Sequence, residues 1–175
     1  MDTLATHLRS AGYYYERNAR EWVITLLLLP SALYFCLSRG SYTVVDSLDR
    51  ILHEVGHVLF GILGGSFEIT GGPLMQVAFP LGLVLYFFRH SFRAGVQVAL
   101  FWLAHNLLNI SIYAADAYTR QLPQLDGHAA HDWNVILTQT GLLEYDIIVG
   151  NAIFLLSIAC FGLVMLLPAL MWGDE

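Results

Sequence analysis

The order of apolar and polar positions divides the chain into five apolar segments separated by short polar turns and one long polar loop. The apolar segments are Trp22–Ser38, Val44–Gly64, Pro73–Phe88, Ala94–Ala115 and Ile147–Trp172. A helix rises about 1.5 Å per residue, so most of these segments approach the roughly 30 Å of a bilayer's hydrocarbon core. The third segment follows Gly71 and Gly72 and contains Pro73 and Pro80. This pattern favours a broken or re-entrant element there over a clean span.

The pattern predicts an all-α integral membrane protein with four to five hydrophobic helices, one of them broken or re-entrant. Residues 1–21 contain Leu4, Leu8 and Tyr13–Tyr15, which indicate an interfacial segment at the amino terminus. Residues 22–175 form a single membrane-embedded helical domain, with an acidic loop at residues 116–146. We expect membrane lipid around this domain and the bacterial cytoplasmic (inner) membrane as its location.

Composition and charge agree with a membrane protein and exclude a nucleic-acid-binding protein. Hydrophobic residues make up 57% of the chain and charged residues only 13%, against about 25% charged residues in typical soluble domains. Eight basic residues, all arginine, face fourteen acidic ones, so the net charge is −6. A nucleic acid needs a positive surface, so nucleic acid is excluded as a partner. The lone cysteines, Cys36 and Cys160, are interpreted as small buried apolar residues.

The arginines also predict an orientation. They cluster near the amino terminus and at Arg89 and Arg93, whereas the loop Asp116–Asp146 has five acidic residues and only Arg120. The positive-inside rule places the arginine clusters in the cytoplasm and the acidic loop outside. This orientation is consistent only if the third segment does not cross the membrane fully.

The second apolar segment differs from a plain anchor because it carries ionisable residues along one side. They are Asp46, Asp49, Arg50, His53, Glu54 and His57. At 3.6 residues per turn these positions fall within an arc of about 140° on a helix. Each ionisable group at the centre of a membrane helix costs about 2.5–3.5 kcal/mol on insertion scales, so six of them call for a reason.

The stripe contains the pattern His53-Glu54-Val55-Gly56-His57, an H-E-x-x-H sequence. Its two histidines lie one helical turn apart, so both imidazoles can reach one metal ion, and Glu54 can act as general base toward a water molecule there. Asp49, one turn earlier, is a candidate partner for the second ring nitrogen of His53. The alternative is a hydrogen-bonded network that fixes helix packing, with Arg50 and Glu54 paired.

An H-E-x-x-H motif on a hydrophobic helix resembles the site-2 protease family of intramembrane zinc metalloproteases. The resemblance implies zinc as the cofactor and a third zinc ligand from a later Leu-Asp-Gly motif. Leu125-Asp126-Gly127 matches that motif and would give the ligand role to Asp126. The family places its aspartate at the start of an apolar helix, whereas here the polar residues 128–134 follow.

Three residues therefore compete to be the third ligand: His131, Asp126 and Asp116. We favour His131, because imidazole is a common zinc ligand and a loop can fold back over the site. Asp116 ends a polar stripe that also contains His105 and Asn109, within about 40° of one another and directed at the bundle interior as supporting residues.

Gln76 is an isolated amide in the third segment. It is either a packing contact or a substrate-clamping group, because a re-entrant segment can offer backbone donors to an extended peptide.

Two functions fit the sequence. The first is a zinc metallopeptidase, a hydrolase that cleaves membrane-protein or peptide substrates in or near the bilayer, with Glu54 as its catalytic residue. The second is a non-catalytic or pseudo-enzyme subunit of a larger electron-transfer or photosynthetic membrane complex. In that case His53, His57 and His105 would bind a metal or a pigment.

Overall fold

The computed structural model describes residue 19, residues 22–122 and residues 131–170. These residues form helices and connecting turns, with no strand among them. The helices are Trp22–Leu37, α2 (Val44–Gly61), α3 (Ser66–Arg89), α4 (Arg93–Ala115), α5 (Asp132–Thr140), the short 3-10 helix η1 (Leu143–Tyr145) and α6 (Asp146–Leu170). The predicted all-α fold is confirmed for this part of the chain. All but one residue of the expected interfacial segment 1–21 lies outside it.

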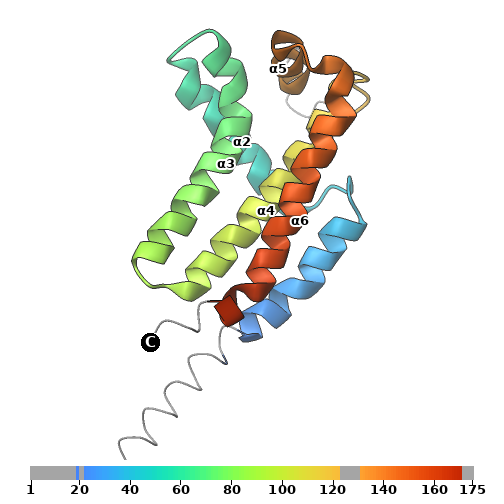
Figure 1. Cartoon of the computed structure of the whole chain (residues 1–175). Helices are drawn as coiled ribbons and strands as arrows, with labels where there is room; N and C mark the ends of the chain where they lie inside the picture. The colour runs from blue at the N-terminus through green and yellow to red at the C-terminus, as the bar shows by residue number, and fades with distance from the viewer. Residues whose placement is uncertain (1–18, 20–21, 123–130, 171–175) are drawn as a thin grey trace, which may run out of the picture.

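The helices pack side by side in a bundle with α4 at its centre (Figure 1). α2 and α3 form an antiparallel hairpin, whose turn contains Gly64 and Gly65 at φ of 67° and 61°. Residues with a Cβ rarely adopt such positive φ values, so glycine suits this tight turn. α5 lies at the same end of the bundle as that turn and as the start of α6 (Figure 1).

Three helices are long and apolar enough to cross a membrane by length and composition. They are Ser66–Arg89, Arg93–Ala115 and the continuous stretch Leu143–Leu170. The Trp22–Leu37 helix is shorter, and α2 carries the polar stripe. The outer side of α6 is apolar, with Leu155, Leu156 and Leu166 all more than half exposed. The structure therefore supports three spans of the expected four to five.

The expected break in the third segment is wrong. α3 is one continuous helix of 24 residues that begins at Ser66 and includes Pro73 and Pro80. An interior proline removes one backbone donor, a loss that neighbouring helices can compensate inside a membrane bundle. Gly71 serves close packing instead: a Cβ there would lie 2.7 Å from the Gly56 carbonyl oxygen, so the backbones of α2 and α3 touch.

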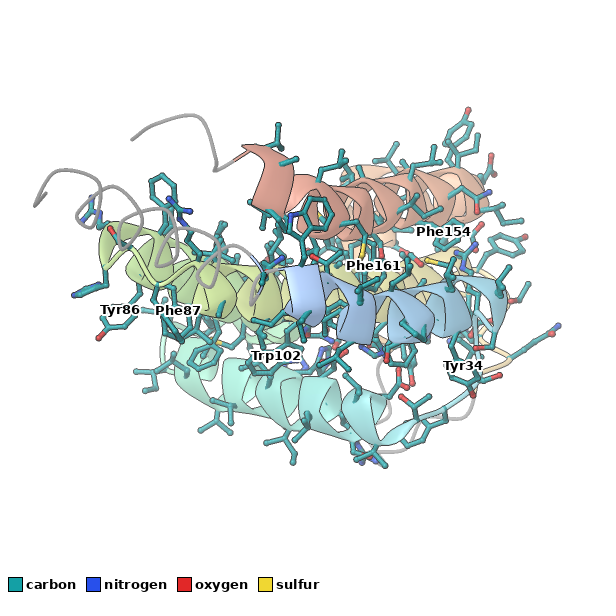
Figure 2. The ribbon with its side chains drawn as sticks, turned by 90° about the horizontal axis from the view of Figure 1, so that it is seen from below. Tyr34, Tyr86, Phe87, Trp102, Phe154 and Phe161 are labelled. Atoms are coloured by element: carbon teal, nitrogen blue, oxygen red, sulfur yellow. The ribbon has the colours of Figure 1, made fainter. Side chains whose placement is uncertain are left out.

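α4 contacts its neighbours through two different surfaces. Its Leu100 and Leu103 pack with Val164 of α6 in an apolar core. Near α2 and α3 its contacts become polar: Trp102 donates from Nε1 to Asp49 Oδ1 at 2.8 Å. Figure 2 labels a residue on each of these surfaces. Trp102 connects α4 to α2 through its hydrogen bond to Asp49, and Phe161 of α6 packs in an apolar cluster with Ala104 of α4. The polar surface of α4 thus supports the stripe of α2.

α5 is held at the end of α4 by its own caps and by one long-range hydrogen bond. His131 is its N-cap and accepts from the Asn134 amide at 3.3 Å. Gly141, at φ 72°, ends the helix in the left-handed conformation that favours glycine. The Asn134 side chain donates to the Ala117 carbonyl at 2.8 Å. These contacts place Asp132, the first residue of α5, against α2.

Candidate metal centre

Three side chains from two helices converge at one point. His53 Nε2 and His57 Nε2 lie 2.9 Å apart on α2. Asp132 Oδ2, from the first turn of α5, lies 2.9 Å from His53 Nε2 and 3.0 Å from His57 Nε2. All three residues are half-buried. The helical spacing of the H-E-x-x-H sequence therefore brings both imidazoles to one site, and Asp132 completes it.

The hydrogen bonds behind the two histidines decide which ring nitrogen carries the proton. His57 Nδ1 lies 2.6 Å from the Glu68 carbonyl oxygen, which can only accept, so Nδ1 donates. His53 Nδ1 likewise lies 2.9 Å from Gln76 Oε1. In a neutral imidazole the other nitrogen then has a lone pair and no proton. Both Nε2 atoms therefore present lone pairs to the centre of the site.

This donor set fits a metal cation. Two lone pairs and a carboxylate oxygen about 3 Å apart repel one another unless a positive charge lies between them. Two imidazoles and one carboxylate are a combination found in catalytic zinc sites, where a fourth position stays open. The structure also provides what metal-binding histidines usually have, a partner for each outer nitrogen.

Glu54 is the remaining ionisable residue of the H-E-x-x-H sequence. It directly follows His53 in the sequence, and its charge acts electrostatically on that histidine. Its carboxyl group is half-buried and makes no hydrogen bond or ion pair with the residues that the structure describes. A carboxylate without such a partner can accept a proton from water.

The position of the His53 ring depends on a glycine of α3. A Cβ on Gly72 would lie 2.5 to 2.7 Å from Cε1, Nε2 and Nδ1 of that ring. Ordinary contacts of a Cβ begin near 3.4 Å, so the ring occupies the space that any other residue at position 72 would fill. The backbone contact of Gly56 with Gly71 brings α3 close enough for this arrangement.

A second cluster, formed by Asp46, Asp49 and His105, lies deeper in the bundle and is buried. Asp49 was expected to hold His53, but its two oxygens accept from Trp102 Nε1 at 2.8 Å and face His105 Nδ1 at 2.6 Å. The hydrogen bonds from α4 thus hold the Asp49 carboxylate away from the candidate metal centre. Since every carboxylate oxygen of this cluster already has a donor, we interpret it as a structural joint between α2 and α4.

His131 is not brought to the other two histidines, although it directly precedes Asp132. Its Nδ1 caps α5, and its buried Nε2 lies 3.8 Å from Asp116 Oδ2. An N-cap residue lies outside the helix and must direct its side chain back at the helix amides. That requirement turns the His131 ring toward the end of α4, so the structure places Asp132 in the position for which we favoured His131.

Asp116 also has a local role, as the residue that ends α4. Its carboxylate accepts from the amides of Gln121 and Leu122 at 2.9 Å each and from the Thr119 hydroxyl at 2.7 Å. Burial opposes its charge, but these hydrogen bonds hold the pKa of Asp116 below its ordinary value. Asp116 therefore organises the turn after α4. The third candidate, Asp126, lies outside the described residues.

Gln76 is buried, and both ends of its amide are engaged. Its Oε1 faces His53, and its Nε2 donates to Asn109 Oδ1 at 3.2 Å. The expected substrate-clamping role does not suit a side chain enclosed in this way. Gln76 contacts His53 instead, and Asn109 contacts the other end of the Gln76 amide.

Asp132 is the candidate site residue that sequence reasoning missed. A signal was present: an acidic residue next to the start of an amphipathic stretch is favoured in the first turn of a helix.

No family model, curated protein or solved structure matches the chain.

Proposed function

We propose that this protein is an integral-membrane zinc metallopeptidase, similar to site-2 proteases, that hydrolyses peptide bonds in or near the bilayer. One observation carries the proposal: His53 Nε2, His57 Nε2 and Asp132 Oδ2 converge within about 3 Å of one another. With only three described protein donors at the centre, a fourth position is left for water and substrate. The resemblance of the H-E-x-x-H sequence to that family supports the same chemistry.

The chain's own residues supply the rest of the proposed reaction. His53, His57 and Asp132 would hold the metal. Zinc, when bound, would supply a Lewis acid that polarises the scissile carbonyl and favours ionisation of water. Glu54 then accepts a proton from the attacking water and returns it to the departing amine, so the peptide bond breaks as the new carbon–oxygen bond is kept.

The position of the site in the bundle suggests where cleavage occurs. Its contacts on α3 run from Glu68, the third residue of that helix, to Gln76, the eleventh. At about 1.5 Å per residue, the site lies within roughly 3 to 15 Å of the first residue of α3. If α3 spans the bilayer, the hydrolysed bond lies in the half of the membrane next to α5.

The alternative of a pigment-binding subunit fits this geometry less well. A haem or chlorophyll ligand approaches the metal perpendicular to a flat macrocycle. His53 and His57 approach each other to 2.9 Å and share a carboxylate oxygen, so a macrocycle has no space between them. His105 is enclosed as well, with its ring 4.3 Å from that of Phe35. A small cation suits the site better.

The test is Glu54→Gln in the purified full-length protein. We expect unchanged zinc content and a loss of about 10²–10⁴-fold in cleavage of labelled single-span membrane peptides, because the amide has no useful basicity. Glu68→Gln is the matched control, since the exposed Glu68 contributes only its backbone carbonyl to the site. A Glu54→Gln protein that cleaves these peptides as fast as the Glu68→Gln control would contradict the proposal and favour a non-catalytic role.

A further inference from the structure

A chain of side-chain hydrogen bonds connects the first turn of α2 to the metal centre. Asn109 Nδ2 donates to Asp46 Oδ1 at 3.0 Å. Gln76 Nε2 donates to Asn109 Oδ1 at 3.2 Å, and Gln76 Oε1 faces His53 Nδ1 at 2.9 Å. Two amides from α3 and α4 therefore lie in series between a carboxylate and a proposed zinc ligand.

Asp46 sets the order of donors and acceptors along this series of hydrogen bonds. Asp46 Oδ2 accepts from the backbone amide and the hydroxyl of Thr43, each at 2.7 Å. A carboxylate has no hydrogen to offer, so Asn109 must direct its NH₂ group, and not its oxygen, at Asp46. The Asn109 oxygen then faces Gln76, which must in turn direct its own NH₂ group at Asn109. The Gln76 oxygen is left to face His53.

We propose that Asp46 is a positioning residue that acts through Asn109 and Gln76 to keep the proton of His53 on Nδ1. The lone pair of His53 then stays on Nε2, the atom that faces His57 and Asp132. If the amides were reversed, Gln76 would offer a hydrogen to Nδ1, and the ring proton would move to Nε2, into the metal centre. This inference rests on the metal site of the proposed function and does not depend on proteolysis.

His57 does not share this dependence on side chains. Its Nδ1 donates to the backbone carbonyl of Glu68, an acceptor that no substitution removes. Asp49 does not share it either, because its oxygens face Trp102 and His105. The proposal therefore assigns different roles to two aspartates that lie one turn apart on the same helix.

The test uses Asp46→Asn, which keeps the shape of the side chain. The two donors of Thr43 hold the new amide oxygen at the Oδ2 position, so its NH₂ group faces Asn109 and reverses both amides. We expect zinc affinity to fall by about 10–100-fold, the usual effect of losing the partner of a metal-binding histidine. The readout is a zinc titration of the metal-free full-length protein in detergent micelles against a competing chelator.

Asp49→Asn is the matched control. It makes the same chemical change one turn along α2, at a carboxylate buried more deeply than Asp46. Because it leaves a buried donor without an acceptor, we expect it to lower the melting temperature. We expect its zinc affinity to match that of the wild type, which separates loss of stability from loss of the His53 lone pair.

A second substitution should rescue the first. In Asp46→Asn/Gln76→Glu, the reversed Asn109 directs its NH₂ group at residue 76, where a carboxylate can accept it. The same carboxylate accepts from His53 Nδ1, and the net charge returns to that of the wild type. We expect zinc affinity to recover most of the loss.

The position of the proton is measured directly by ¹⁵N NMR of the histidine rings in the metal-free protein. We expect the signals of His53 to show a proton on Nδ1 in the wild type and in the double variant, and on Nε2 in Asp46→Asn. Wild-type zinc affinity in Asp46→Asn would overturn the inference, as would a double variant that binds no better than Asp46→Asn. A wild-type protein that binds no zinc would instead contradict the proposed function.

Discussion

Gly72→Ala tests whether the close packing of α3 on the His53 ring positions the proposed metal centre. The added Cβ would lie 2.6 Å from His53 Nε2, whereas ordinary contacts begin near 3.4 Å. The ring must therefore move by about 0.8 Å, or α3 must move away from α2. Neither movement is easy, because Gln76 holds the ring at Nδ1 and Gly56 and Gly71 keep the two backbones in contact.

A displacement of this size is large for a metal ligand. Zinc–nitrogen distances in proteins fall within about 0.2 Å of their usual values. We therefore expect Gly72→Ala to weaken zinc binding by at least about tenfold, the lower end of what loss of a ligand's support usually causes. The readout is zinc affinity of the full-length protein, measured by competition with a chelator.

Gly82→Ala is the control, because it makes the same change in the same helix with nothing within 4 Å of the added Cβ. Alanine is favoured over glycine in a helix by about 1 kcal/mol, so neither variant should lose stability through helix propensity. We expect the Gly82→Ala protein to bind zinc as the wild type does. Equal zinc affinity in the two variants would refute the idea that Gly72 makes room for a metal-binding His53.

Two further predictions concern the residues around α5. Asp132→Ala should abolish tight zinc binding, whereas His131→Ala should keep it and lose about 1 kcal/mol of stability because an N-cap is removed. Zinc titration and thermal unfolding of both variants check this prediction. The opposite ranking of zinc affinities would give the ligand role to His131. Asp116→Asn should lower the melting temperature at neutral pH. Since the folded pKa of Asp116 lies below its unfolded value of about 3.9, its stabilisation is fully present above pH 5 and is lost as the pH falls below 4. Melting temperatures from pH 3 to 7 should show the gap between wild type and variant closing at the acidic end, and a gap independent of pH would contradict it.

The part of the site that could be predicted from sequence is the part that one helix encodes. His53 and His57 lie four residues apart, so helical geometry alone brings their rings to one side. The partner of His53 could not be found in this way. The sequence offers Asp49, one turn before His53, but Asp49 is engaged by Trp102 of α4, and Gln76 of α3 contacts His53 in its place.

The third residue of the candidate metal centre lies one position from the predicted one, for a related reason. His131 and Asp132 are adjacent, and only the start of α5 decides which of them faces α2. Histidine is not among the residues most favoured as N-caps, so residue preference alone does not assign His131 that role. For α3, Pro73 and the glycine pair predict a break, whereas in the structure the glycines allow close contact with α2. Such contacts depend on the partner helix and are not visible in a local pattern.

X-ray absorption at the zinc edge of the purified full-length protein tests the central claim most directly. We predict one zinc per chain, bound by two imidazole nitrogens and by oxygen at about 2.0–2.2 Å, without sulfur. The imidazole signal should be lost together with the zinc in His57→Ala. A wild-type protein without zinc, or a His57→Ala protein that keeps zinc in the same coordination, would contradict the account.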